Sequence, residues 1–239
     1  LATDLSVYER PPNFAYISLR EGKHGAEEII DEVIEKNSRW KVQHFAFVEH
    51  GVATRFSELY LKTLDLLAQR NLDVNFYALG NVAPSDFVRQ PDLADFMKRA
   101  GFAQVFLSDD RNIPQNEFAI EAFVGDCREA GEACRKAGFA ARTESVCGAV
   151  CLGRPGEDLE ERVSMATLVA HHVGAVIFWP YQPSPEECLE VALEEQNGKL
   201  FPFREENGYS FKDYMNVMGL VTVLNSKHRS QTFDFLGDG

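Results

Sequence analysis

The sequence predicts an α/β fold in which six strand–helix units share a parallel sheet and form a partial, TIM-like (β/α)6 barrel. Strand-like and helix-like segments alternate along the chain, as they do where right-handed crossovers join parallel strands. A closed barrel has eight such units in about 250 residues. Because this chain offers six units in 239 residues, we expect an open sheet. A flat, doubly wound sheet is the alternative.

Each expected strand is a short apolar run bounded by turn-forming or charged residues. The runs are rich in Val, Phe and Ala, which is typical of strands in a buried parallel sheet. In chain order they are DLSVYE (4–9), VQHFAFVEH (42–50), DVNFYALGN (73–81), FAQVFLSDD (102–110), AARTESVCGAVCLG (140–153) and AVIFWPYQP (175–183).

The expected helices are recognised by apolar residues at helical spacing. The third has Pro91 near its first turn and Gly101 at its end, which is the usual asymmetry of helix ends. Gly138 and Gly174 end two others. In chain order the helices are expected at 26–37, 55–70, 90–101, 118–138, 157–174 and 210–230.

We expect residues 1–200 to form the barrel and residues 201–239 to form a C-terminal helix and tail that pack on it. In both candidate folds, ligands bind at the carboxyl ends of the strands. The first segment there, RPPNFAYISLREGKH (10–24), has no helical or strand period, and structureless connections of its length are usually functional or disordered. The segments that follow the strands are 10–24, 49–54, 80–89, 108–117, 152–157 and 180–204.

The composition excludes several partners. The net charge of −13 argues against nucleic acid and against an anionic membrane surface, since both bind basic faces. No apolar run reaches the length of about 18 residues that would span a membrane, and no signal peptide is recognisable at the start. Five cysteines, an odd number, suit a reducing cytoplasm. The abrupt opening LATDLSVYE suggests a fragment or a processed chain.

Four segments occur in a recognisable order: ADFMKRAGFAQVFLS (94–108), GEACRKAGF (131–139), GRPGEDLEERV (153–163) and IFWPYQPSP (177–185). Together they resemble the core domain of the radical S-adenosylmethionine (SAM) superfamily, of the type often associated with a cobalamin-binding domain. The resemblance covers nearly the whole chain. It implies a six-unit partial barrel.

The resemblance also implies a [4Fe–4S] cluster, held by a Cys-x-x-x-Cys-x-x-Cys motif in the loop after the first strand. When RPPNFAYI is aligned with that motif, Tyr16 matches its aromatic position, but the three ligand positions are Arg10, Phe14 and Ile17. Clusters are held by thiolates and occasionally by imidazoles, and none of these three side chains can replace them. We therefore expect the cluster, and with it reductive SAM cleavage, to be absent.

Other cysteines and histidines do not suggest a second metal site. Cys147 and Cys151 share a face if the fifth strand is regular, while Cys127 and Cys134 lie in line on the fourth helix. Free cysteines usually behave as small buried hydrophobes, which is the interpretation we favour. The histidines show no ligand spacing. No metal is predicted.

If SAM still binds, the resemblance points to residues at the strand ends. Tyr16 would line the cavity, Glu49 would lie near the SAM amino group, and Ser108 with Asp109 would lie near the ribose. Glu49 has the alternative interpretation of a solvated rim carboxylate, and Asp109 that of a loop cap. In GRPGED, the acidic residues are expected to complement a helix dipole rather than to hold phosphate.

Substrate contacts are expected from the last two strands. Arg142 and Glu144 have opposite charges and period-two spacing, so they would face the same side of the fifth strand. A charged pair there is costly unless it is paired or lies in a polar cavity, which is the substrate space of the resembled family. Tyr181 and Gln182 follow the sixth strand, where they are either ligand contacts or ordinary turn residues.

Three hypotheses of function remain open. The first is a cluster-less radical-SAM-like protein that acts as a non-catalytic binding or partner subunit, beside an intact radical SAM homologue or a cobalamin-binding protein. The second is an enzyme that uses SAM for non-radical chemistry such as methyl transfer. The third is a substituted or truncated radical SAM methyltransferase. No nucleophile or acid–base set stands out, so no catalytic residue is assigned.

Overall fold

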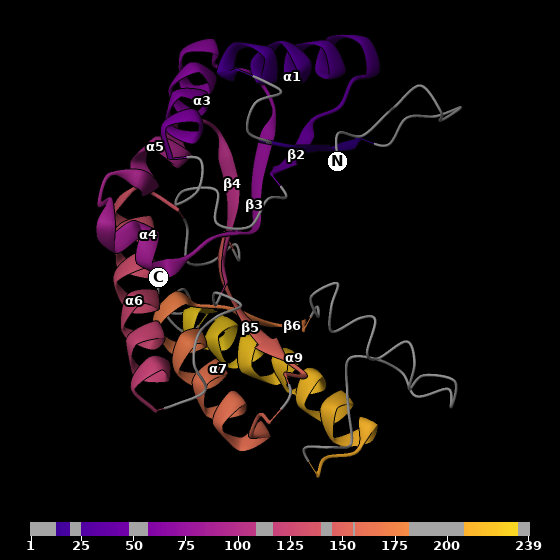
Figure 1. Cartoon of the computed structure of the whole chain (residues 1–239), viewed down its shortest axis with the longest axis vertical. Helices are drawn as coiled ribbons and strands as arrows, with labels where there is room; N and C mark the ends of the chain where they lie inside the picture. The colour runs from indigo at the N-terminus through magenta and orange to yellow at the C-terminus, as the bar shows by residue number, and fades with distance from the viewer. Residues whose placement is uncertain are drawn as a thin grey trace.

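A computed structural model describes residues 13–19, 25–47, 57–108, 117–139, 145–154, 156–181 and 208–233 (Figure 1). Its centre is a six-stranded sheet in which every pairing is parallel. The strand order follows the chain without a reversal. The strands are β1 (Phe14–Ile17), β2 (His44–Phe47), β3 (Asn75–Val82), β4 (Phe102–Ser108), β5 (Val146–Leu152) and β6 (Val176–Pro180).

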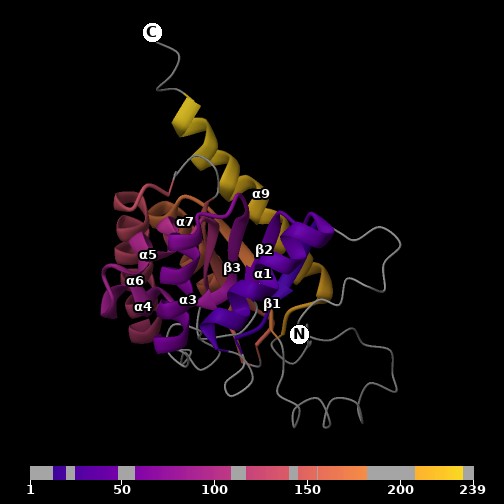
Figure 2. The same ribbon diagram turned by 90° about the horizontal axis from the view of Figure 1, so that it is seen from above.

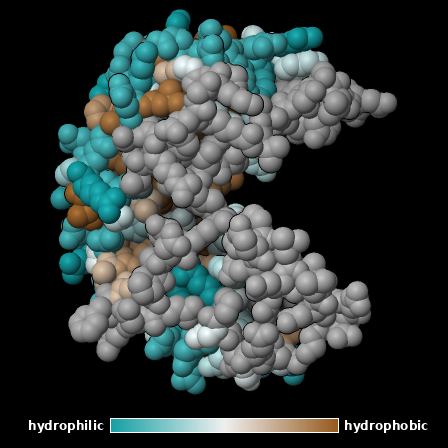
Figure 3. Space-filling model, in the orientation of Figure 1, coloured by the Kyte–Doolittle hydropathy of each residue, from teal (hydrophilic) through white to brown (hydrophobic). Residues whose placement is uncertain are grey.

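Helices follow the strands in alternation and gather on one side of the sheet (Figures 1 and 2). Their outer surface over α1 and α3 is mainly hydrophilic, as expected for helices that bury one face only (Figure 3). They are α1 (Ala26–Trp40), α3 (Ser57–Arg70), α4 (Pro84–Arg89), α5 (Leu93–Arg99), α6 (Glu117–Lys136), α7 (Leu159–Val173) and α9 (Phe211–Phe233).

This arrangement confirms an α/β protein with an all-parallel sheet. A doubly wound sheet reverses its strand order part-way, and the sequential order of the described strands does not fit that alternative. The sheet is open, since β1 and β6 are its two edges. None of the described helices combines the length and the apolar character needed to cross a membrane.

Side chains alternate between the two faces of the sheet. On the helix-covered face, Phe47 stacks on Phe102 with ring centroids 5.6 Å apart, and Phe76 lies 5.7 Å from Phe102. Ile17 on β1 and Val105 on β4 belong to the same buried core. Because a strand has a side-chain period of two, the intervening residues point to the face that these helices do not cover.

Two sequence predictions are wrong in detail. The segment 10–24 is not a structureless loop, because β1 (Phe14–Ile17) lies inside it and pairs with β2; the strand predicted at 4–9 lies outside the described residues. The segment 80–89 contains the short helix α4. Pro84 opens this helix, and the Asp86 carboxylate accepts a hydrogen bond from the Ala83 N–H at 2.9 Å, so proline and capping chemistry start it.

The C-terminal helix protects the free edge of the sheet. Asn225 of α9 accepts a hydrogen bond from the Val176 N–H at 3.0 Å and donates one to the Val176 carbonyl at 2.9 Å. Its amide thus imitates the neighbouring strand that β6 lacks on this side. An unpaired edge is a site for pairing with other chains. This contact covers part of the β6 edge, and the sheet remains open.

Replacing Asn225 by Leu is expected to destabilise the protein by about 1–3 kcal/mol, because the buried Val176 N–H and carbonyl lose both partners. Urea unfolding measures the change. Replacing Asn216, an exposed Asn on the same helix, by Leu is the control and is expected to change the free energy of unfolding by less than about 0.5 kcal/mol. Equal effects of the two changes would contradict the edge contact.

Gly148 on β5 is required because α7 packs directly against it. A Cβ at this position would collide with a methyl group of the buried Val169. Gly148→Ala is therefore expected to cost about 1–3 kcal/mol, as overpacking does. Gly125→Ala on α6, where a Cβ meets nothing within 4 Å, should be neutral or stabilising. If thermal unfolding shows both changes to be harmless, the packing of α7 on β5 is wrong.

Candidate functional site

One face of the sheet is left uncovered by the described helices, and we call it the helix-free face. It is lined by aromatic and polar side chains. Tyr16 on β1 is 43% exposed and Trp179 on β6 is 39% exposed, while Tyr77 on β3 and Phe106 on β4 are half-buried. Large aromatic side chains on a soluble domain are normally placed in its core. Their repeated exposure on one face marks a surface suited to contact another molecule.

The aromatic residues form a cluster at the β1–β3 end of this face. The rings of Phe14 and Tyr16 meet edge to face with centroids 5.3 Å apart, and Phe14 lies 6.0 Å from Tyr77. Nδ1 of His44 lies 2.9 Å from the Tyr77 hydroxyl, at hydrogen-bond distance. The cluster therefore offers π-faces for stacking next to a titratable imidazole.

The strand register explains how this cluster arises. Tyr16 pairs with Ala46, Ala46 with Tyr77, and Tyr77 with Gln104. These residues form a row across four strands, in which the small Ala46 separates two phenol rings. Residues directly opposite each other on neighbouring strands lie within contact distance, so the row presents hydroxyl and amide groups along one line.

Farther along the sheet, on β5, the side chains on the same face are small and apolar. Cys147 and Cys151 on β5 are both buried, and Ala149 lies between them. Burial raises the pKa of the Cys147 thiol to about 12, which keeps it protonated and unreactive near neutral pH. Among the described residues, no three His, Cys, Asp or Glu side chains lie close enough to hold a metal ion.

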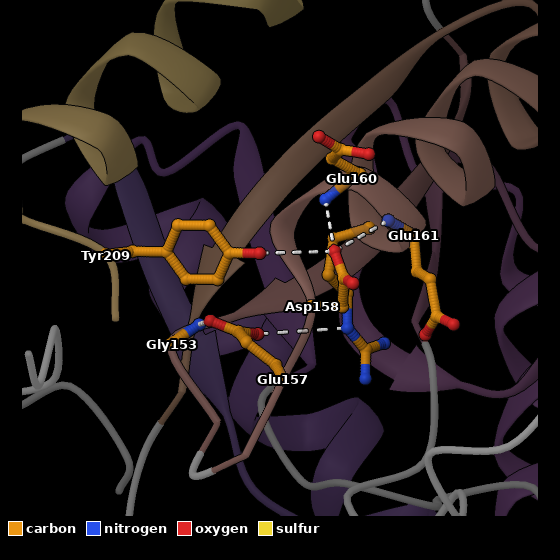
Figure 4. Close-up of polar contacts among 7 residues, drawn as sticks. Gly153, Glu157, Asp158, Glu160, Glu161 and Tyr209 are labelled. Atoms are coloured by element: carbon orange, nitrogen blue, oxygen red, sulfur yellow. Dashed lines mark hydrogen bonds and ion pairs between the residues drawn. The ribbon is translucent and has the colours of Figure 1, made fainter. Parts of the chain in front are cut away.

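A second polar cluster lies at the carboxyl end of β5, in the turn that leads to α7 (Figure 4). The Glu157 carboxylate is buried and accepts a hydrogen bond from the Gly153 N–H at 2.6 Å. Nε of the buried Arg162 lies 3.7 Å from the same carboxylate. The Tyr214 hydroxyl of α9 also donates to Glu157. One carboxylate thus connects a strand end, α7 and α9.

Burial raises the pKa of Glu157 above its ordinary value, although the Gly153 N–H, Arg162 and Tyr214 all favour the charged form. Removing a carboxylate from water costs several kcal/mol, which partners only partly repay. Because the Gly153 N–H, Arg162 and Tyr214 all converge on Glu157, we interpret the cluster as a structural junction rather than as a ligand site.

Asp158 confirms the expected role of the acidic GRPGED residues. Its carboxylate caps α7 by accepting hydrogen bonds from the N–H groups of Glu160 and Glu161, at 2.7 and 3.4 Å (Figure 4). The Tyr209 hydroxyl reaches the same oxygen at 3.3 Å. The N–H groups that an anion would need are therefore already occupied, and an acidic side chain stands where the anion would bind.

The structure brings some of the predicted site residues to the helix-free face. Tyr16 and Ser108 both lie there, and Phe14 joins the aromatic cluster. Ile17 lies on the opposite face, in the core. Tyr181 follows β6, and its N–H donates to the Leu152 carbonyl at 2.8 Å. The predicted residues outside the described part of the chain are Arg10, Glu49, Asp109, Arg142, Glu144 and Gln182.

Sequence reasoning missed the contributions of His44, Tyr77 and Glu157. Tyr77 alternates with buried neighbours along β3, so the period-two pattern of that strand could have placed it on the less buried face. β2 has no such pattern, because the three residues after His44 are all buried. The contact between His44 and Tyr77 depends on the register between β2 and β3. Glu157 was expected at a helix start, but its burial against α9 involves residues more than fifty positions apart.

No family model matches the chain, and a search of curated proteins finds no match. What this face could bind is therefore argued from its chemistry alone. Its aromatic rings favour a planar or cationic ligand, because stacking and cation–π contacts both use a ring face.

Glu157→Ala is expected to lower the free energy of unfolding by about 3–5 kcal/mol, because it leaves the buried Arg162 without its carboxylate. Chemical denaturation measures the loss. Glu160→Ala removes an exposed carboxylate from the same first turn, and this control should change stability by less than about 0.5 kcal/mol. A loss no larger for Glu157 than for Glu160 would refute the junction.

The junction also predicts a sign for the pH dependence. Because the pKa of Glu157 is higher in the folded than in the unfolded protein, the folded protein binds more protons in the window just above the ordinary pKa of 4.5. Stability from this group therefore falls as the pH rises through that window. Relative to Glu157→Gln, the wild-type protein should lose stability as the pH rises above 4.5. A wild-type free energy of unfolding that rises relative to that of Glu157→Gln over this range would contradict the assignment.

Proposed function

We propose that the protein is a radical-SAM-like partial barrel without the family's iron–sulfur cluster, and that it serves as a non-catalytic binding or partner subunit. Its ligand would lie against the helix-free face, at the cluster of Phe14, Tyr16, His44 and Tyr77. The observation that carries the proposal is the exposure of aromatic and polar side chains on a face that the described helices leave uncovered.

The partial-barrel part of the proposal is supported by connectivity. The six strands follow chain order, and helices such as α1 and α6 lie on one side of the sheet (Figure 1). In a (β/α) barrel, strands follow one another in the same way and helices form the outer ring. The helix-free face would then be the inner face of an open barrel, where the resembled family binds its ligands.

The absence of the cluster is supported by the position of β1. In the resembled family the three cysteines follow the first strand, which here ends at Ile17. The sequence has no cysteine before Cys127, so the inference does not depend on how the segment 10–24 is aligned. Phe14 and Ile17 lie in β1 three residues apart and face opposite sides of the sheet, so this segment could not direct both positions to one metal.

SAM is the ligand we propose first. Its adenine offers a planar face for stacking, and its sulfonium offers a cation for the face of a Tyr or Trp ring. Tyr16 and Tyr77 are the phenol rings placed for such contacts. An intact radical SAM homologue or a cobalamin-binding protein is the proposed partner, because a binding subunit without a cluster needs another protein to perform chemistry.

A catalytic alternative has one observation in its favour. The hydrogen-bond distance of 2.9 Å between His44 and Tyr77 places an imidazole and a phenol where a bound molecule would lie, and such a pair can transfer a proton. The chemistry would be non-radical SAM-dependent transfer. His44→Gln separates the hypotheses when SAM affinity and methyl transfer are both measured, since an enzyme would lose far more turnover than affinity, while a binding protein would show no turnover before or after the change.

Calorimetry with SAM tests the ligand. Tyr16→Ala is expected to weaken binding by about tenfold, because one stacking contact contributes about 1–3 kcal/mol. Val88→Ala, a change of a similarly exposed residue on α4, should leave the affinity unchanged. Binding that is insensitive to Tyr16 would move the ligand away from this face, and no binding at all would rule out SAM.

The cluster is tested separately. After anaerobic reconstitution with iron and sulfide, we expect no visible Fe–S absorption and no stoichiometric iron, because the segment that follows β1 contains no thiolate. A broad visible band with about four irons per chain, as a [4Fe–4S] cluster requires, would overturn the cluster-less proposal whatever the outcome of the SAM titration.

A further inference from the structure

A groove lies on the helix side of the molecule, between α4, α5 and α6. These helices lie on one side of the sheet (Figures 1 and 2), and each of them contacts the other two. The groove has a volume of about 710 Å³, and ligand pockets usually have about 300–1,000 Å³. The residues that line it all belong to the described part of the chain. Because the aromatic cluster lies on the other face of the sheet, the groove is a separate candidate site.

Carboxylates line the groove from two sides. Asp92 and Asp95 come from the start of α5, and Glu129 and Glu132 come from α6. All four residues are exposed. Within the described part of the chain, none of the four carboxylates forms an ion pair or a hydrogen bond. Acidic side chains that line a cleft together raise the local concentration of cations, so the groove is suited to a positively charged ligand.

The spacing of these carboxylates favours a large cation over a metal ion. Among the described residues, no three acidic side chains lie close enough to hold a metal. A guanidinium is larger and carries five N–H donors in a planar fork, so it can bridge carboxylates that lie farther apart. The buried Phe87 and the half-buried Ala133 also line the groove, and the aliphatic stem of an arginine packs well on such apolar surface. The groove therefore fits an arginine side chain.

We propose that the groove binds an arginine-containing segment of a partner protein. Arg128 and Lys136 line it beside Glu129 and Glu132, and they lie about 12 Å apart along α6, at about 1.5 Å per residue. That length matches about three or four residues of extended peptide. A polyamine is cationic along its whole length and would meet Arg128 or Lys136 with a like charge. A peptide can place arginine at the carboxylates and neutral or acidic residues at the two cations, so the mixed lining favours a peptide.

Charge also favours a basic partner over a second copy of the chain. The groove carries four carboxylates and two cations, which gives it a formal charge of −2, and the chain as a whole carries −13. Long-range attraction therefore draws a basic segment toward the groove, while two copies of this chain repel each other. Binding at the groove does not depend on SAM, because none of the residues of the aromatic cluster lines the groove.

Fluorescence anisotropy with a labelled Leu-Arg-Arg-Leu peptide tests the proposal. The double variant Asp95→Asn/Glu132→Gln removes one carboxylate from each side of the groove, and we expect it to bind the peptide about three- to tenfold more weakly, because exposed ion pairs are individually weak. The matched control, Asp31→Asn/Glu121→Gln, removes the same charge from exposed positions outside the groove. It should bind like the wild-type chain. Because all four positions are exposed, both variants should fold.

A second peptide, in which citrulline replaces both arginines, tests the charge. It keeps the size of the side chains without their charge, and we expect it to bind at least about tenfold more weakly than the arginine peptide. Four results would overturn the proposal: no saturable binding of the arginine peptide, equal binding of the citrulline peptide, an equal loss in the two double variants, or displacement of the peptide by spermidine at lower concentration than by unlabelled peptide. The last result would assign the groove to a polyamine. Since no measurement involves SAM, these outcomes are distinguishable from a failure of the proposed SAM site.

Discussion

The fold of this protein depends on the way six parallel strands follow one another in chain order. Each strand must return to the same end of the sheet before the next begins, so each connection crosses one face, and right-handed crossovers place the helices on the same side. That side is filled by rings such as Phe47, Phe76 and Phe102. The other face remains without helices among the described elements, and alternate residues of every strand are presented there.

The buried carboxylate of Glu157 connects the end of the sheet to the helices α7 and α9. Glu157 accepts the Gly153 N–H at the end of β5, lies beside Arg162 of α7 and accepts from Tyr214 of α9. Burying this charge costs stability. Removing one partner costs more stability than replacing the whole cluster by apolar residues, because the remaining charge is left buried and unpaired. The cluster therefore holds α9 in one position, from which Asn225 reaches the free edge of β6.

The same geometry leaves one face of the sheet with a chemistry of its own. The face that the described helices leave uncovered combines aromatic rings with a histidine and a tyrosine at hydrogen-bond distance. Such a combination would suit a small planar or cationic molecule.

Much of the fold could be predicted from the sequence, because alternation, apolar spacing and terminal glycines are local signals. The helices at α1, α6 and α7 were predicted within a few residues for this reason. The strand β1 at Phe14–Ile17 was not predicted, because its four residues lie in a segment with two prolines and no clear period; the strand predicted at 4–9 lies outside the described residues. The helix α4 was missed because six residues are too few to show a helical period.

The sequence by itself therefore determined the class of the fold, the buried character of the described cysteines and the lack of cysteines near the first described strand. Only the tertiary structure decided which residues meet. Tyr16 was found by resemblance, but its neighbours Phe14, His44 and Tyr77 are joined by strand register, which depends on the packing of the whole sheet. Glu157 and Tyr214, like Asn225 and Val176, are far apart in the chain, and their contacts exist because burial makes an unpaired polar group too costly to leave alone.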